Sequence, residues 1–66
     1  MNAKEILTKV YNSLKEGGYD PARQISGYLL SGDPTYVTDV DGARALICSI
    51  DREQLLCELV NGCLGN

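Results

Sequence analysis

The sequence of 66 residues contains no histidine, no tryptophan and no phenylalanine. Without histidine, the chain lacks the usual base that activates a serine or cysteine nucleophile, and it lacks the nitrogen ligand typical of zinc sites. It also has no run of the roughly 20 apolar residues that a membrane-spanning helix needs, and its N-terminus does not resemble a signal peptide. We therefore expect a cytoplasmic protein that is not an enzyme, holds no metal or cofactor and does not enter a membrane.

Basic residues are also few: six stand against nine acidic residues, for a net charge of −3. They are scattered singly, whereas nucleic-acid affinity depends on clustered lysines and arginines. Nucleic acid is therefore not an expected partner. The cysteines Cys48, Cys57 and Cys63 are an odd number without Cys-x-x-Cys spacing, which is typical of free cytoplasmic thiols.

One acidic stretch, Asp39-Val40-Asp41-Gly42, invites comparison with a calcium-binding loop, in which glycine occupies the sixth position. In that register the first position is Val37 and the twelfth is Cys48, so the loop lacks its first carboxylate and its bidentate glutamate. The stretch is better interpreted as a solvated turn that caps the next helix.

A chain this short forms one domain at most, and a domain of about 60 residues buries only about 60% of the surface of its unfolded chain. A single core of that size seldom contributes more than ~3–5 kcal/mol. We therefore expect residues 1–66 to form one helical domain that is completed by homodimerisation.

Two amphipathic helices are predicted in the first half of the chain. The first follows Asn2, a candidate N-cap, and ends at Gly17-Gly18. The second starts at Asp20-Pro21, because aspartate is a good N-cap and proline is tolerated at the first helical position. The apolar residues that recur at helical spacing are Ile6, Leu7, Val10, Tyr11 and Leu14 in the first helix, and Ile25, Tyr28 and Leu29 in the second.

The turn Gly32-Asp33-Pro34 ends the second helix. Glycine can adopt the left-handed conformation of a helix C-terminus, aspartate can cap the next helical turn, and proline suits a first helical position. Residues 35–38 mix helical and β signals, so we predict an irregular segment with one helical turn, followed by a turn over residues 39–42.

Two more helices are predicted after this segment. Asp41 is a candidate cap for a short third helix, and Asp51 with Gln54 resembles a capping box that opens a fourth helix, whose end Gly62 and Gly65 fray. The fold class is therefore all-α, a compact bundle of about four short helices. The predicted apolar faces consist of Ala43, Leu46, Ile47 and Ile50 in the third helix, and of Leu55, Leu56, Leu59, Val60 and Cys63 in the fourth.

Tyrosines and one glycine are candidates for structural or interface roles. Tyr11 and Tyr28 lie at core spacing, whereas Tyr19 and Tyr36 follow turns and either pack over them or meet a second chain. Gly27, in the middle of a helix, leaves a flat spot that admits a close neighbour.

Arg44 has two interpretations. It either binds an anion at a helix start or pairs with Asp33, Asp39 or Asp41, and the pairing is the simpler of the two. The turn residues Pro21, Gly32, Asp33 and Pro34 complete the set of candidate residues.

Several runs of residues lie in an order that resembles one known family. The longest is Gly27-Tyr28-Leu29-Leu30-Ser31-Gly32-Asp33-Pro34, preceded by Gly18-Tyr19-Asp20-Pro21 and Arg23-Gln24-Ile25. The similarity starts near Leu7, continues without a gap through Ala43-Arg44, and ends near Val60. On these residues the chain resembles the IreB family of small regulatory phosphoproteins from low-GC Gram-positive bacteria.

The resemblance implies a non-catalytic cytoplasmic regulator downstream of a membrane Ser/Thr kinase in the cell-wall stress response. It also implies phosphothreonines in an N-terminal segment, but this sequence opens almost directly on its first predicted helix, so no phosphosite is carried over. Among the chain's own threonines, Thr8 lies within a predicted helix, whereas Thr35 and Thr38 lie in the irregular segment and are the better candidates. The expected partners are a second copy of the chain and a regulatory protein partner such as a Ser/Thr kinase.

A helix-turn-helix module that binds DNA is the alternative, from a different class of protein. Short helices that meet at glycine-containing turns suit such a module, but its recognition helix needs base-reading side chains flanked by positive charge. Between Pro21 and Ser31, only Arg23 and Gln24 qualify.

Overall fold

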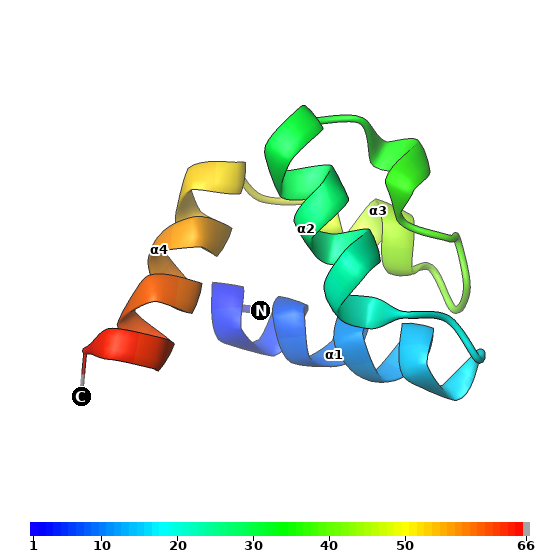
Figure 1. Cartoon of the computed structure of the whole chain (residues 1–66), viewed down its shortest axis with the longest axis horizontal. Coiled ribbons are helices and arrows are strands. Elements are labelled where there is room, and N and C mark those ends of the chain that lie inside the picture. Colours follow the sequence, from blue (N-terminus) through cyan, green and yellow to red (C-terminus); the bar gives the residue numbers. More distant parts are fainter. Residues whose placement is uncertain (66) are drawn as a thin grey trace.

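Five helical segments joined by short turns make up the computed structural model, which describes residues 1–65. No strand occurs within that range, so the predicted all-α class with four α-helices is confirmed. Helix α1 crosses the molecule, α2 packs over it, and α4 lies beside the start of α1 (Figure 1). In chain order the segments are α1 (Ala3–Glu16), α2 (Pro21–Ser31), the single 3₁₀ turn η1 (Pro34–Tyr36), α3 (Ala43–Ile47) and α4 (Arg52–Leu64).

Helix α1 starts at a reciprocal cap. The side chain of Asn2 accepts a hydrogen bond from the backbone N–H of Glu5 (2.8 Å), and the carboxylate of Glu5 accepts one from the N–H of Asn2 (2.9 Å). The two bonds satisfy two backbone donors at the helix start. One of these donors, the N–H of Glu5, belongs to the first turn, whose N–H groups have no partner within the helix. At the other end, Gly17 donates its N–H to the carbonyl of Ser13 (3.1 Å). Both ends lie where the sequence predicts.

Helix α2 also has its predicted ends. Oδ1 of Asp20 accepts a hydrogen bond from the N–H of Arg23 (3.2 Å), and Pro21 follows as the first helical residue. The helix ends at Gly32, whose φ of 77° lies in the left-handed region and whose N–H reaches the carbonyl of Tyr28 (2.7 Å). A residue with a Cβ would be strained at that position.

The core forms around α1, which packs against α2, α3 and α4. Tyr28 of α2 is buried there, as predicted, and burial raises the pKa of its hydroxyl. The adjacent thiol of Cys48 raises that pKa further, and the positive charge of Arg52 opposes the shift. The buried apolar residues are Ile6, Leu7, Val10, Leu14, Ile25, Tyr28, Val37, Ala43, Ile47 and Leu55.

Arg52, the first residue of α4, links that helix to the end of α2. Its Nη1 donates a hydrogen bond to the carbonyl of Leu29 (3.1 Å). The guanidinium lies directly over Gly32, where a Cβ would stand 2.8 Å from Cζ. A cation at a helix C-terminus is favourable because the last carbonyls carry partial negative charge. The contact therefore stabilises the end of α2 and positions the start of α4.

One predicted cap is wrong, and a second lacks its predicted side-chain bonds. Asp41 does not cap α3: it has a positive φ of 53°, and Gly42, also left-handed at 72°, is the N-cap residue, without a side-chain hydrogen bond. The turn therefore places the cap one residue later than predicted. Asp51 is the N-cap residue of α4, but its side chain makes no capping hydrogen bond, so the box with Gln54 does not form. The Asp51 side chain is exposed, so water can satisfy it, and only its carbonyl accepts from the helix, at Gln54 and Leu55.

Candidate binding surface

Helix α4 leaves an apolar stripe in solvent. Of its residues, only Leu55 is buried, whereas Leu56 is 44% exposed, Val60 55% and Leu64 84%. The helix also continues through Gly62 to Leu64, so the predicted fraying at Gly62 is wrong. Residues at helical spacing share one side of a helix. We call this side the α4 face and define it by Leu56, Leu59, Val60, Cys63 and Leu64.

Of the predicted apolar face of the fourth helix, one copy of the chain buries Leu55 and leaves Leu56, Leu59, Val60 and Cys63 exposed. Leu55 points toward α1 and fills the core, and the side of α4 that carries Leu56 and Val60 is turned away from it. The sequence marks these residues as apolar but does not say whether the same chain covers them. In a monomeric protein, contiguous exposed apolar patches are often sites of interaction.

An apolar groove continues from the α4 face across α1 and α2. It has a volume of about 280 Å³ and is lined by Leu7, Tyr11, Ala22, Ile25, Ser26, Leu29 and Leu59. Leu59 belongs to both features, so the α4 face and the groove form one surface. A second hollow, between α1 and α4, also includes Leu59 and has a similar volume of about 280 Å³.

Tyr11 lines this groove and is 43% exposed, so the prediction that it is a core residue is wrong. It stands next to Val10, which is completely buried, and a step of one residue turns a helical side chain by about 100°. This step places the Tyr11 ring at the edge of the buried stripe. Tyr19 is also exposed, at 44%, and its ring lies against Gly17, where a Cβ would stand 3.0 Å from Cε2. Tyr19 therefore packs over the turn that precedes α2.

Gly27 and Tyr36 form a second, more closely packed feature. The ring of Tyr36 lies on the backbone of Gly27, where a Cβ would stand 2.9 Å from Cε1 and closer still to Cδ1. Gly27 thus has the close neighbour that its place in the helix suggests. The other side of the ring is open, since Tyr36 is 51% exposed. This contact packs η1 against the middle of α2.

Asp33 holds the η1 turn in place. Its Oδ1 accepts two hydrogen bonds from Thr35, one from the backbone N–H (3.0 Å) and one from the hydroxyl (2.7 Å). The hydroxyl bond, then the backbone bond, lowers the pKa of the Asp33 carboxyl, and the charge of Arg44 adds to the effect. Pro34 follows Asp33 as the first residue of the turn, as predicted.

Arg44 is not held by the predicted ion pair. Its Nε donates a hydrogen bond to the carbonyl of Val37 (2.9 Å), and it acts on Asp33 through its charge. Gln24 makes a comparable contact with Thr38: its Nε2 donates to Oγ1 (3.0 Å), and its Oε1 accepts from the N–H (2.9 Å). A residue bound in this way is not available to read bases, which weighs against the helix-turn-helix interpretation.

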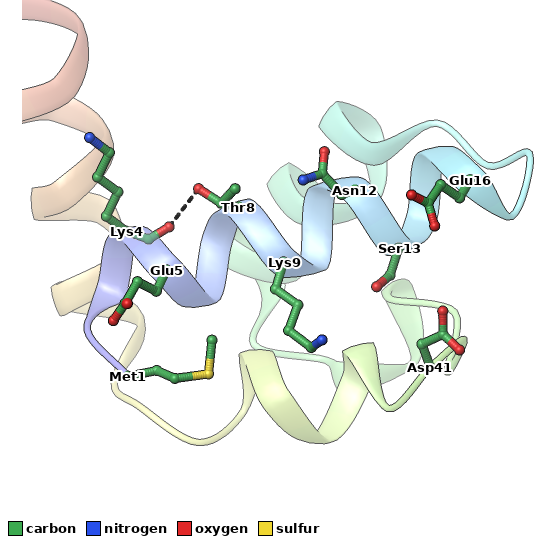
Figure 2. Close-up of a pocket in the computed structure, with 9 residues that line it drawn as sticks. All are labelled: Met1, Lys4, Glu5, Thr8, Lys9, Asn12, Ser13, Glu16 and Asp41. Atoms are coloured by element: carbon green, nitrogen blue, oxygen red, sulfur yellow. Dashed lines mark hydrogen bonds between the residues drawn. The ribbon is translucent and has the colours of Figure 1, made fainter.

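A polar hollow of about 610 Å³ lies along the other side of α1 (Figure 2). Lys9 and Ser13 point toward it from α1, and Asp41 approaches from the turn before α3. The carboxylate of Glu5 is already engaged by the N–H of Asn2. Two carboxyl groups held together in a sheltered cleft would suggest acid–base catalysis. This hollow is open to solvent and its charges are mixed, so it does not support an active site.

Cysteines and metal ligands define no site either. Cys48, Cys57 and Cys63 are all free and exposed. Within residues 1–65 no three side chains of the metal-binding types gather. In the same range, no helix has the length and apolar character that crossing a bilayer requires.

The fold and its surface define a small all-α protein with an apolar face that its own chain leaves open. The model of the family described as IreB regulatory phosphoprotein matches residues 1–64 of this chain. The chain therefore belongs to the IreB family, and the match includes α1, η1, the irregular segment and all of α4. The resemblance drawn from the sequence is confirmed, and the family description is regulatory rather than catalytic.

Proposed function

We propose that this chain is a non-catalytic regulator that acts by binding other proteins through the α4 face, and that its first partner is a second copy of itself. The observation that carries the proposal is the stripe of Leu56, Val60 and Leu64, which is exposed in one copy. Burying such side chains gives the apolar free energy that drives most protein association.

The size of the chain supports a homodimer. A standard interface buries about 800 Å² on each partner, which is about a fifth of this chain's accessible surface of 4337 Å². The α4 face and the adjoining groove extend over three helices and offer a surface of this kind. A small core gains stability from association, because a partner that binds only the folded state shifts the folding equilibrium.

Membership of the family supports a role for this chain in a phosphorylation-dependent pathway. The family description, a regulatory phosphoprotein, supports a phosphate as the regulatory input of this chain. From the resemblance we further infer that the chain is a cytoplasmic protein that acts downstream of a membrane Ser/Thr kinase in the cell-wall stress response. The kinase is then its second partner.

Sedimentation equilibrium tests the homodimer. We expect the parent chain to sediment as a dimer at micromolar concentration and to melt at a temperature that rises with concentration. Leu56→Glu places a charge on the α4 face and is expected to give monomers. Leu30→Glu is the matched control, because Leu30 is an 88% exposed leucine on α2 that does not line the groove. A parent chain that stays a 7.2 kDa monomer at high micromolar concentration, with concentration-independent melting, contradicts the proposal.

Intact-mass measurement tests the regulatory input. The chain is isolated from its native cells before and after exposure to a cell-wall antibiotic, and the fraction that carries one phosphate is determined. We expect this fraction to change with the exposure. A chain that carries no phosphate under either condition contradicts the role as a phosphoprotein, whatever its oligomeric state.

A further inference from the structure

We propose that Asp41 is a site of spontaneous covalent modification, at which the chain closes a succinimide ring with the nitrogen of Gly42 and reopens as an isoaspartate. The turn that holds these two residues takes no part in the proposed function. Among residues 1–65, Asp41 is the one residue other than glycine with a positive φ, at 53°. Its backbone conformation and its neighbour together favour the ring.

The residue that follows an aspartate decides how easily such a ring closes. The attacking group is the backbone nitrogen of that residue, so a proline has no N–H to give up and a large side chain crowds the approach. Of the five aspartates, two precede proline, one precedes valine, one precedes arginine, and only Asp41 precedes a glycine. Asp41 and Gly42 are both exposed, and a Cβ at Gly42 would meet nothing within 4 Å. The approach is therefore open.

The turn holds Asp41 close to the geometry that the ring requires. The N–H of Ala43 donates to the carbonyl of Val40 (2.9 Å), and the two residues between them have φ of 53° and 72°, as in a type I′ turn. To close the ring, Cβ of Asp41 must eclipse the nitrogen of Gly42 about the Cα–C bond. This arrangement corresponds to a positive φ with a ψ of about −120°, the conformation of the first central residue in a type II′ turn.

Only the peptide group between Asp41 and Gly42 has to rotate to reach that geometry. Type I′ and type II′ turns have the same end residues, so the bond from Ala43 to Val40 is kept. Within residues 1–65, neither the carbonyl of Asp41 nor the N–H of Gly42 takes part in a backbone hydrogen bond. The rotation reverses the sign of φ at Gly42, which a glycine tolerates. The folded backbone therefore does not protect this position.

The reaction needs only water. The nitrogen of Gly42 bonds to Cγ of Asp41, and its proton leaves with the carboxyl hydroxyl as one water molecule, which gives the succinimide. Water then adds to the backbone carbonyl carbon of Asp41, and the bond from that carbon to the nitrogen breaks. In the product the chain passes through Cβ and Cγ, and a free carboxylate remains on Cα. Addition of water at Cγ instead regenerates the aspartate.

The isoaspartate changes the start of α3. It adds one methylene to the main chain inside the turn that Ala43 closes on Val40. The carbonyl of Gly42, which accepts from the N–H of Leu46 (3.0 Å), then moves relative to the helix. Helix α3 has only five residues, and its first residue, Ala43, is buried at 1% exposure. The longer linkage therefore loosens α3 where it packs against α1.

Incubation in water labelled with a heavy oxygen isotope locates the reaction, because each passage through the succinimide inserts one labelled oxygen. Peptides from the incubated chain are then measured by mass spectrometry. We expect label on Asp41 but not on Asp39 or Asp51, at a rate in the folded chain no slower than in guanidinium chloride. Asn61-Gly62 is the internal control, because a ring there requires α4 to open, so folding should slow its reaction by about tenfold or more.

Two variants show whether the ring is the route. Asp41→Glu keeps the carboxylate but would need a six-membered ring, so we expect it to take up no label. Asp41→Asn loses ammonia instead of water when the ring closes and should react faster than the parent chain. The proposed site is overturned if Asp41 takes up label more slowly in the folded chain than in the denatured chain, or no faster than Asp39.

Ligation at Cys48 tests the effect on α3. A synthetic peptide of residues 1–47 with isoaspartate at position 41 is joined to residues 48–66, and the matched chain with ordinary aspartate is made in the same way. We expect the amides of Ala43 and Leu46 to exchange hydrogen about tenfold or more faster in the isoaspartate chain. Equal exchange in the two chains overturns the proposed loosening of α3.

Discussion

Helices α1 and α4 are almost equal in length, at 14 and 13 residues, but they differ in what stabilises them. Helix α1 has a reciprocal cap at Asn2 and Glu5 and a continuous buried stripe. Helix α4 has no side-chain cap, and Leu55 is its one buried residue. Isolated helices of this length are marginal in water, so most of their stability comes from packing. Contacts within one copy thus account for α1 and leave α4 only partly stabilised.

The largest expected effect is the loss of stability when a leucine of α1 is truncated to alanine, compared with the same truncation in α4. Leu14→Ala removes a completely buried side chain of α1 and should cost ~2–5 kcal/mol, enough to unfold much of a small domain. Leu56→Ala on α4 should cost little when the chain is monomeric. Urea denaturation at low concentration measures both. A similar loss in the two variants would mean that the α4 face is covered within one copy.

Glycines in two helices give the next contrast. Gly27→Leu drives a side chain into the Tyr36 ring and should cost about 1–3 kcal/mol, with part of the loss recovered when Tyr36→Ala is added. Gly62→Leu is the matched control, because a Cβ at Gly62 meets nothing within 4 Å, so the better helix propensity of leucine is expected to stabilise α4 by up to ~1 kcal/mol. Thermal melting at low concentration separates the two. An unchanged stability for Gly27→Leu would show that the glycine is not a packing position.

Removing the caps tests the two helix starts. Asn2→Ala loses the reciprocal bonds with Glu5 and should cost ~1 kcal/mol. Asp51→Ala removes a side chain that makes no capping hydrogen bond and should have a smaller effect. The comparison uses urea midpoints measured under the same conditions. Equal losses would indicate that Asp51 caps α4 in solution.

The smallest expected effect concerns pH and the η1 turn. Because hydrogen bonds from Thr35 lower the pKa of Asp33, this carboxylate stabilises the folded state fully above its ordinary pKa of about 3.9, and the contribution is lost as pH falls through the lower folded value. Thr35→Val removes the hydroxyl bond and should raise the pKa of Asp33. NMR titration of the carboxyl carbon measures both values. A pKa that is the same in both chains would argue against the hydroxyl bond.

Local signals in the sequence were sufficient for the helix ends of the first half. Asn2, Asp20 and Gly32 act within three or four residues of their own positions, so their roles can be inferred from residue type and spacing. The cap at Asp41 failed because the chain enters α3 from a left-handed turn whose dihedral angles the residue types do not specify. Asp51 stands at the predicted N-cap position of α4 with an extended backbone, but its side chain makes no capping hydrogen bond. A left-handed aspartate before a glycine is uncommon enough to escape a pattern-based prediction.

The candidate surface was harder to predict than the fold. Apolar spacing marks Tyr11, Leu56 and Val60, but it cannot say which side of a helix the same chain covers. Arg44 forms a hydrogen bond with the carbonyl of Val37, and Gln24 forms two hydrogen bonds with Thr38. These contacts depend on the tertiary positions of the residues, which no local sequence pattern contains. Gly27 was the exception, because a glycine inside a helix already signals a close neighbour, although not that the neighbour is Tyr36.

The contact of Arg52 with Gly32 has a consequence for how this sequence can vary. Gly32 is constrained twice, by its left-handed backbone and by the guanidinium above it. Asparagine tolerates such a backbone, but its Cβ would displace Arg52 and free the carbonyl of Leu29. A change at position 32 therefore has a different cost depending on the residue at position 52. We expect the two positions to be inherited as a pair, so that relatives with a side chain at the first have a shorter residue at the second.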